Sequence, residues 1–253
     1  MIVSAMWEQP TWLHVPEWVS GDIWHFPYAF HTFKKYIPPQ SLALEVGFGS
    51  GRLMTRIARE LDCRCVGVDP DDTAFSSLSF FSQQHKVSTD PMKGSGFCLP
   101  FKDNSFDVVY SEGVIEHFPI EQSQAMITEH ARVCREGGIV VVSVPNRFAL
   151  FHTLTKLLLG KRFLFYPEAS LSTFDLSQLM ARAGLSTTKR DGFAFGCQFY
   201  MLKALFFDQA PTPWPKNLGL KLLSLLRRSP LYHFESPRLN AIAGFQTLVV
   251  GRK

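Results

Sequence analysis

Short apolar runs alternate with longer segments of helical periodicity over most of the chain. After the first of these runs, Leu53, Ile57 and Leu61 recur at the spacing of one helix face. The pattern up to residue 145 predicts strands at 41–46, 64–69, 87–97, 106–110 and 139–144, with helices between them. Strands that alternate with helices in this way form an open, doubly wound α/β sheet.

Capping residues set the expected helix boundaries, because proline stops a helix, Asp or Ser begins one and glycine ends one. The expected helices are 28–36 before Pro38 and Pro39, one that begins at Asp72, 121–135 before Gly137 and Gly138, and one from Ser172 or Thr173 to Ala183 and Gly184. Two further strands are expected near 185–195 and 245–250.

The length of the chain allows one sizeable domain with additions, whereas two full domains would be tight. We therefore expect residues 1–253 to form a single domain. The segment 1–36, rich in Trp, Pro and His, is the expected N-terminal aromatic lid with its helix. The segment 196–241 breaks the strand–helix alternation and is the expected cap insertion before the last strand.

Charge and composition indicate which partners and cellular settings to expect for this protein. The net charge of +4 comes without a stripe of Lys and Arg, so no nucleic acid is expected. The five cysteines are scattered, with Cys63 and Cys65 alternating on one strand, and we expect reduced core thiols and no metal site. No run reaches the roughly 18 apolar residues of a membrane span, and the N-terminus is not typical of a signal peptide. The expected location is cytoplasmic.

A glycine-rich turn follows the first strand, with Gly47, Gly49 and Gly51 in the pattern G-x-G-x-G. Glycines let the backbone bend sharply and approach a ligand closely. A dinucleotide fingerprint is G-x-G-x-x-G, and Arg52 stands where its third glycine would be. Glu45 would repel a pyrophosphate and attract an ammonium group. The turn therefore favours a ligand with a cationic amino-acid portion and no phosphates.

Asp69 ends the second strand, about where an acid of such a sheet takes ribose hydroxyls. Together with the turn, it indicates a nucleoside cofactor. Two other interpretations remain open at this point. Asp69 could serve as a helix N-cap or a surface turn residue, and Glu45 could be a buried acid paired with a lysine.

The ordered set of motifs resembles the class I S-adenosylmethionine-dependent methyltransferases, nearest to the branch that methylates small molecules, quinones and lipids. The segments that carry this resemblance are E-V-G-F-G-S-G at 45–51, V-G-V-D-P at 66–70, L-P-F-K-D-N-S-F-D-V-V at 99–109, S-E-G-V-I-E-H-F at 111–118 and G-G-I-V-V-V-S-V-P-N at 137–146. The resemblance implies a Rossmann-like, mostly parallel sheet whose last strand is antiparallel and lies between its neighbours. It also implies S-adenosylmethionine as the cofactor.

The same resemblance assigns cofactor-binding roles to individual positions. The implied residues are Glu45 near the amino group, Gly47, Gly49 and Gly51 along the methionine and ribose, Asp69 at the ribose hydroxyls, Pro70, Gly96 and Phe97 at the adenine, and Ser111, Glu112 and Gly113 under the methionine end. The family usually places an acid before the L-P-F run to receive the adenine amino group, whereas this chain has Ser95. An uncharged acceptor there is expected to weaken cofactor binding by about 1 kcal/mol.

His117 is the candidate catalytic residue, since an imidazole can accept a proton from an acceptor near neutral pH. The alternative is that the V-I-E-H run packs the start of a helix, with the imidazole hydrogen-bonded to the backbone. The expected activity is in-line methyl transfer to a small, apolar or lipid-like acceptor. A non-catalytic S-adenosylmethionine-binding module is an alternative, and an NAD(P)-dependent oxidoreductase is a weaker one.

The cap segment contains a leucine-rich run with Lys216, Lys221, Arg227 and Arg228. A helix of this kind over 216–228 could lie on an anionic membrane or cover a lipidic substrate. A packed cap helix with a solvated basic edge is the alternative.

Overall fold

The computed structural model describes residues 26–160, 168–201, 225, 230 and 233–253. The chain forms two compact units. The described residues of the first unit are 26–112, 128–141 and 252–253, and those of the second are 113–127 and 142–251 outside the gaps just given. The lid residues 1–25 and nearly all of the predicted helix 216–228 lie outside the described residues.

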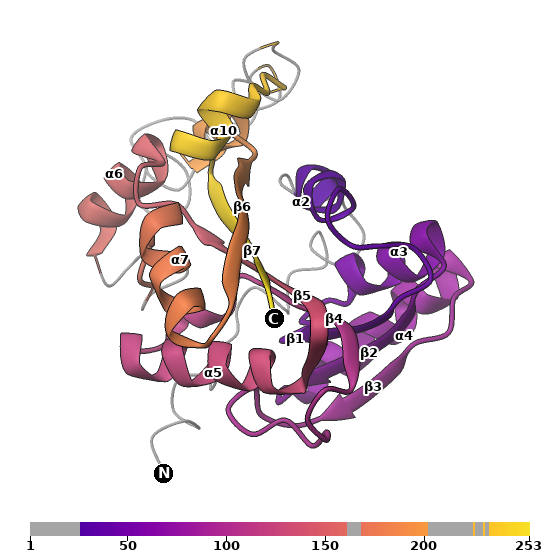
Figure 1. Cartoon of the computed structure of the whole chain (residues 1–253). Helices are drawn as coiled ribbons and strands as arrows, with labels where there is room; N and C mark the ends of the chain where they lie inside the picture. Colours follow the sequence, from indigo (N-terminus) through magenta and orange to yellow (C-terminus); the bar gives the residue numbers. More distant parts are fainter. Residues whose placement is uncertain (1–25, 161–167, 202–224, 226–229, 231–232) are drawn as a thin grey trace. The chain divides into compact units, whose positions relative to one another are not determined.

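Seven strands form one sheet in the order β3-β2-β1-β4-β5-β7-β6 (Figure 1). The strands are β1 Leu42–Val46, β2 Arg64–Asp69, β3 Asp90–Lys93, β4 Phe106–Glu112, β5 Cys134–Pro145, β6 Ser186–Phe193 and β7 Gln246–Arg252. β1 pairs in parallel with β2 on one side and with β4 on the other, and β2 pairs in parallel with β3. The predicted doubly wound α/β sheet is confirmed.

The last strand runs antiparallel to β5. The amide of Gly137, early in β5, donates to the Lys253 carbonyl at 3.1 Å, whereas the amide of Asn146, just after β5, donates to the Phe245 carbonyl at 3.0 Å. The start of one strand therefore meets the end of the other. β7 also lies between β5 and β6, as the resemblance implied.

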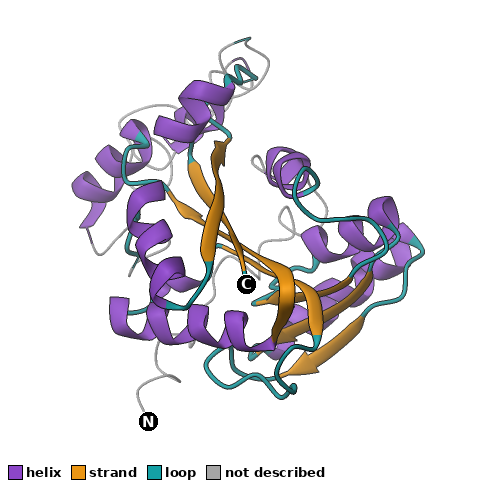
Figure 2. Ribbon diagram, viewed as in Figure 1, coloured by secondary structure: helices purple, strands orange, loops and turns teal. Residues whose placement is uncertain are grey.

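The helices of the first unit are α2 Phe26–Phe33, α3 Arg52–Leu61 and α4 Asp72–His85 (Figure 2). α3 contacts α2, α4 and β2, and its buried face carries Leu53, Ile57 and Leu61 as the spacing predicted. The prediction of Asp72 as an N-cap was wrong by one residue. Asp71 has the extended backbone of a cap, and its Oδ1 accepts the Thr73 amide at 2.8 Å.

The remaining helices among the described residues are η2 Ile115–His117, α5 Ile120–Val133, α6 Leu150–Leu159, α7 Thr173–Arg182, η4 Gly196–Met201 and α10 Pro237–Ala243. Ser172 caps α7 in a capping box with Asp175, which confirms the first of the two predicted starts. The sequence pattern did not predict α6.

Gly137 and Gly138 do not end a helix, because α5 stops at Val133 and both glycines lie inside β5. A Cβ atom on Gly138 would lie 2.7 Å from Cys134 Sγ and 2.8 Å from the Asp107 carbonyl oxygen. The glycine therefore serves a close approach of two strands rather than a turn. Cys98 is exposed, so the expectation of five core thiols was wrong there, and the other four are buried. Among the described helices, none is both long enough and apolar enough to cross a membrane.

Candidate cofactor site

The predicted cofactor residues of the first unit gather at one edge of its sheet. Glu45 pairs with Tyr110 and Val46 with Val68, so β1, β2 and β4 end at similar heights. Parallel strands present their carboxyl ends at the same edge, which is where open α/β sheets bind ligands. The glycine turn follows β1 at this edge, Asp69 ends β2 and Glu112 ends β4.

The glycine turn has a backbone that side chains rarely tolerate. Gly47, Gly49 and Gly51 have φ values of 73°, 48° and 72°, all in the left-handed region that favours glycine. The Gly47 amide donates to the Val68 carbonyl at 2.7 Å, and the Gly51 amide donates to the Phe48 carbonyl at 2.7 Å. The G-x-G-x-G spacing thus matches three positions at which the backbone is left-handed.

Asp69 braces this turn from the neighbouring strand. Its Oδ2 accepts the Gly49 amide at 2.8 Å and its Oδ1 accepts the Asp71 amide at 2.9 Å. A carboxylate offers about four lone-pair sites, so two remain for hydroxyl donors. The side chain is buried, and burial raises the pKa of Asp69 despite the two amides that lower it.

Glu45 lies beneath the turn, 3% exposed, and joins two strands to a helix. Its Oε2 accepts the Tyr110 hydroxyl at 3.1 Å, and the carboxylate also accepts the backbone amide of Met54. Met54 belongs to the first turn of α3, whose N-cap, Gly51, has no side chain to serve that purpose. The alternative of a lysine partner for Glu45 was wrong, since its side-chain partner is the phenol of Tyr110.

Burial raises the pKa of Glu45 well above its ordinary value of 4.5, and the nearby negative charges of Glu112 and Asp69 raise it further. Hydrogen bonds from Tyr110 and from the Met54 amide lower this pKa but do not offset the effect of burial. Three acids therefore share this edge of the first unit. Such an edge attracts a cationic group and repels a diphosphate.

Replacement of Glu45 by glutamine is expected to flatten the dependence of stability on pH. The unfolded chain ionises Glu45 near 4.5, whereas the folded chain keeps the proton to a higher pH. Between these values the unfolded state binds fewer protons, so the free energy of unfolding falls as the pH rises. Glutamine has no such proton and keeps one acceptor oxygen. Urea unfolding over a pH series measures how the free energy of unfolding depends on pH. The control is Glu121→Gln, at an exposed position. The same pH dependence in Glu45→Gln as in the wild type would contradict the raised pKa of Glu45.

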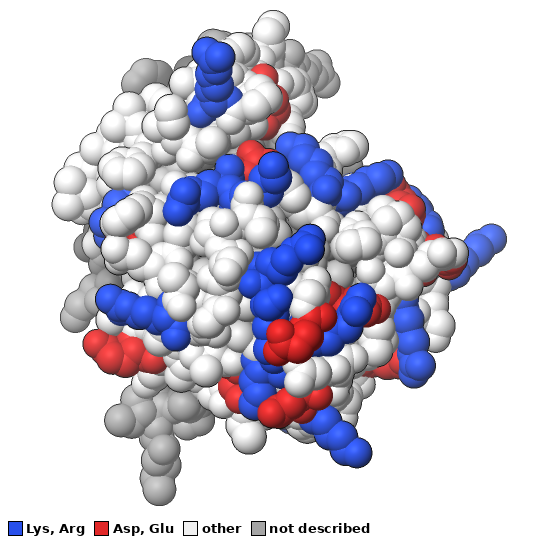
Figure 3. Space-filling model, in the orientation of Figure 1, with Lys and Arg blue, Asp and Glu red and all other residues white. Residues whose placement is uncertain are grey.

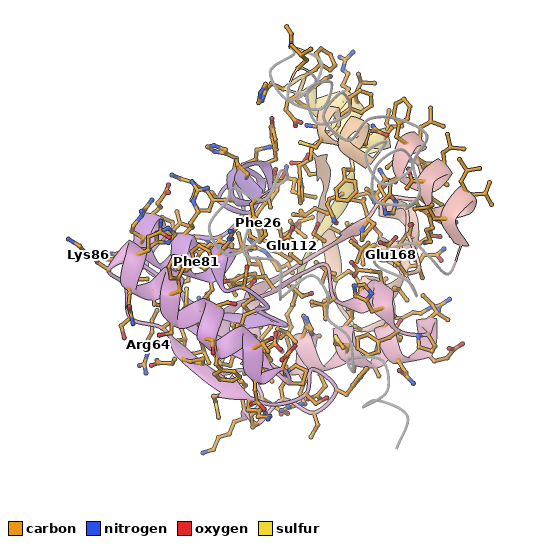
Figure 4. The ribbon with its side chains drawn as sticks, turned by 180° about the vertical axis from the view of Figure 1, so that it is seen from behind. Phe26, Arg64, Phe81, Lys86, Glu112 and Glu168 are labelled. Carbon is orange, nitrogen blue, oxygen red and sulfur yellow. The ribbon has the colours of Figure 1, made fainter. Side chains whose placement is uncertain are left out.

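Arg52 occupies the first position of α3 and is buried. Its guanidinium lies over the Phe81 ring at 4.6 Å and over the Phe26 ring at 5.6 Å. Phe81 and Phe26, labelled in Figure 4, belong to α4 and α2, so three helices contribute to this contact. The residue that departs from the dinucleotide fingerprint is thus a packing element. Sequence reasoning treated it only as a missing glycine.

Other predicted site residues lie as follows. Ser95 is exposed and accepts the Phe97 amide on its Oγ at 3.3 Å, and Gly96 lies between them. Pro70 is exposed after β2. The Ser111 hydroxyl is buried near the end of β4, with no hydrogen-bond partner among the described residues.

Gly113 and His117 belong to the second unit. Gly113 has a φ of 69° and donates its amide to the Ser143 carbonyl at 3.0 Å. His117 ends η2 and is half-buried, with its amide donating to the Val114 carbonyl at 3.3 Å. Sequence reasoning missed Tyr110 as a partner of Glu45. The register of β1 against β4 could have identified Tyr110, because it lies directly opposite Glu45 and residues opposite one another on neighbouring strands interact.

Comparisons with known proteins agree with this geometry. Residues 44–142 match the family described as Methyltransferase domain. An uncharacterized methyltransferase of Mycobacteroides abscessus is 35% identical over 104 residues, which is 40% of this chain and 38% of that protein. A ubiquinone biosynthesis O-methyltransferase of Rhizobium johnstonii is 27% identical over 158 residues, 60% of this chain and 62% of that protein. Both alignments span less than two thirds of the relative's length.

The fold is shared with solved methyltransferases. A SAM-dependent methyltransferase from Thermotoga maritima superposes with a TM-score of 0.56, 19% sequence identity, and coverage of 88% of this chain and 87% of that one. Residues 44–142 therefore carry the sequence of a methyltransferase domain, and the chain shares the fold of solved methyltransferases.

Proposed function

We propose that this chain transfers a methyl group from S-adenosylmethionine to a small, apolar or lipid-like acceptor. The observation that carries the proposal is the turn of three left-handed glycines, braced by the buried Asp69 and lying over the buried Glu45. The match of residues 44–142 to a methyltransferase domain, a range that contains the turn, Glu45 and Asp69, supports the proposal.

The described residues fit this cofactor chemically. The glycines leave the backbone open to close approach by a ligand. Asp69 retains acceptor capacity for the ribose hydroxyls, and the acidic edge formed by Glu45 and Glu112 suits an ammonium group and a sulfonium better than phosphates. The Ser111 hydroxyl and the segment Ser95–Phe97 are further proposed contacts. When bound, the cofactor supplies an electrophilic methyl group with a neutral thioether as leaving group.

The acceptor class rests on composition and on the relatives. Phe occurs 23 times in the chain, which suits an apolar acceptor. The relative from Rhizobium johnstonii is named for ubiquinone biosynthesis, which supports an acceptor of that apolar kind. The lid at 1–36 and the cap at 196–241 are proposed to cover it.

We propose that His117 accepts a proton from the acceptor. η2 is held in place within the second unit because the Ala169 amide donates to the Glu116 carbonyl at 2.7 Å. His117→Ala is expected to lower kcat about 100-fold with a hydroxyl acceptor, within the usual range for a general base. Cofactor affinity, measured by calorimetry, is expected to stay unchanged. Full turnover in this variant would remove His117 from the reaction and leave it a packing role.

A ligand screen by thermal unfolding tests the cofactor. S-adenosylmethionine and S-adenosylhomocysteine are expected to raise the melting temperature, since a ligand at 100 times its Kd adds about 2.7 kcal/mol to stability. NAD is expected to leave it unchanged. Formation of S-adenosylhomocysteine with a panel of phenolic and lipid acceptors then tests catalysis. Cofactor binding without turnover on any of them would favour the non-catalytic module.

A further inference from the structure

A cluster of polar side chains lies in the second unit around the carboxylate of Glu168, which is labelled in Figure 4. His152 Nε2 lies 3.3 Å from Glu168 Oε1, and the two side chains are 0% and 2% exposed. Lys156 Nζ and Ser170 Oγ lie 3.3 Å and 3.1 Å from the same oxygen. We call Glu168 and these three residues the Glu168 cluster. No step proposed above uses it.

The Glu168 cluster differs from the charged groups of the surface. On the face shown in Figure 3, acidic side chains lie beside basic ones in contact with water, which weakens their attraction. A buried carboxylate is costly unless charged or polar partners compensate it. Burial alone would raise the pKa of Glu168, yet its three partners together lower it below the ordinary value of 4.5. The carboxylate is therefore ionised at neutral pH, and its removal would take a shared acceptor from all three partners.

The cluster ties α6 to a short segment that is distant from it in the sequence. His152 and Lys156 belong to α6, whereas the other two residues of the cluster lie in the segment 168–171, which we call the linking segment. The His152 ring also packs edge-on against Phe245, with ring centroids 5.2 Å apart at an angle of 85°. Buried side chains of α6 therefore hold the linking segment through the carboxylate.

The linking segment in turn connects the end of β5 to η2. Leu171 forms a parallel bridge with Asn146, the residue that follows β5. Two residues earlier, the Ala169 amide donates to the Glu116 carbonyl at 2.7 Å. Glu116 directly precedes His117 in η2. A continuous set of contacts thus runs from α6 through the linking segment to the residue next to His117.

η2 depends on contacts from outside the helix. It has only three residues, Ile115–His117, and hydrogen bonds of such a short 3₁₀ turn have poor geometry. The His117 amide donates to the Val114 carbonyl at 3.3 Å, and the Phe118 amide donates to the Ile115 carbonyl at 3.3 Å. The bond from Ala169, at 2.7 Å, is shorter than both. Displacement of the linking segment is therefore expected to displace η2.

We propose that Glu168 is a positioning residue for His117. The buried carboxylate holds the linking segment, the Ala169 amide of that segment holds η2, and η2 carries His117. This inference rests on the proposed role of His117 as the proton acceptor in methyl transfer. It gives Glu168 no contact with the cofactor or the acceptor.

Hydrogen exchange followed by NMR tests the link without relying on activity. In Glu168→Ala, the amides of Ala169 and His117 are expected to exchange at least about tenfold faster, because the linking segment opens locally. The amide of Val249, in the central strand β7, reports global unfolding and is expected to change less. The matched control is Asp175→Ala, which removes a carboxylate that caps α7 in the same unit. It is expected to leave the exchange of Ala169 and His117 unchanged relative to Val249.

Kinetics then test whether the link serves the reaction. Glu168→Ala is expected to lower kcat about tenfold and to leave S-adenosylmethionine affinity unchanged. Glu168→Gln keeps one acceptor oxygen and is expected to recover part of that loss. Ala169→Pro removes the amide that donates to Glu116. The double variant Glu168→Ala/Ala169→Pro is expected to lose no more than the more impaired single variant, because both changes break one link.

Several outcomes would overturn the proposal. Unchanged exchange at Ala169 and His117 in Glu168→Ala contradicts it, as does a kcat equal to that of the wild type. Losses that multiply in the double variant show that Glu168 acts by a route other than the Ala169 amide. Glu168→Gln is submitted to the same measurements, with smaller expected effects, if Glu168→Ala does not fold. A wild-type chain without turnover removes the proposed methyl transfer, whereas faster exchange in Glu168→Ala would still support the hold of Glu168 on η2.

Discussion

Replacing Gly51 by alanine is expected to lower the free energy of unfolding by about 2–5 kcal/mol. The left-handed backbone at φ +72° costs an L-residue about 1–2 kcal/mol. The new Cβ would also lie 2.4 Å from Leu78 Cδ1, 2.9 Å from Leu78 Cβ and 3.1 Å from Leu78 Cα. The Leu78 methyl group can rotate away, whereas its Cβ and Cα can move only with α4, and forced overpacking adds about 1–3 kcal/mol.

Gly137 offers a matched control for this substitution. Its φ is +73°, and a Cβ there would meet nothing within 4 Å. Gly137→Ala therefore carries the backbone strain without the clash, at about 1–2 kcal/mol. Urea unfolding of both variants measures the difference, which reports the packing of α4 against the turn. Equal losses in the two variants would contradict that packing.

Asp69→Ala is expected to weaken S-adenosylmethionine binding at least tenfold, which corresponds to about 1.4 kcal/mol or more. The substitution removes the proposed acceptor of the ribose hydroxyls. It also removes the acceptors of the Gly49 and Asp71 amides, so the turn loses its brace. The two losses act together, because an unbraced turn must be ordered again when the cofactor binds.

Calorimetric titration of Asp69→Ala and Asp69→Asn measures the loss. Asparagine keeps the size of the side chain, but its NH₂ group replaces an oxygen that accepts the amide of either Gly49 or Asp71. The control is Asp72→Ala, whose exposed ion pair with Lys93 is worth about 0–1 kcal/mol at most. An affinity for Asp69→Ala within twofold of wild type would exclude the ribose role.

The central strands β1, β2, β4 and β5 were predictable because they contain nearly continuous apolar runs bounded by strong turn signals. β2 was predicted at its observed limits, and β1 and β4 within a few residues, since parallel strands buried on both faces leave little ambiguity. α6 was not predicted, although Leu150, Leu154, Leu157 and Leu158 recur at the spacing of one helix face. The Gly137–Gly138 pair misled because glycine at a close strand approach has the same sequence signature as glycine at a helix end.

The site was predictable where motif and topology coincide. The three glycines and Asp69 lie together because each directly follows or ends a parallel strand. The contacts of Glu45 with Tyr110 and Met54 required the register of β1 against β4 and the start of α3, which spacing does not give. The stacking of Arg52 on Phe26 and Phe81 likewise depends on the packing of three helices.

The place of β7 in the sheet has a consequence for how the chain is made. β7 is the last of the seven strands to leave the ribosome, yet it lies between β5 and β6. Until it emerges, the sheet-edge amides of β5 and the whole of β6 have no neighbouring strand, and such open edges invite pairing between nascent chains. Strands β3, β2, β1 and β4 can pair during synthesis. β5 and β6 gain β7 as their neighbour only after residues 246–252 have been translated.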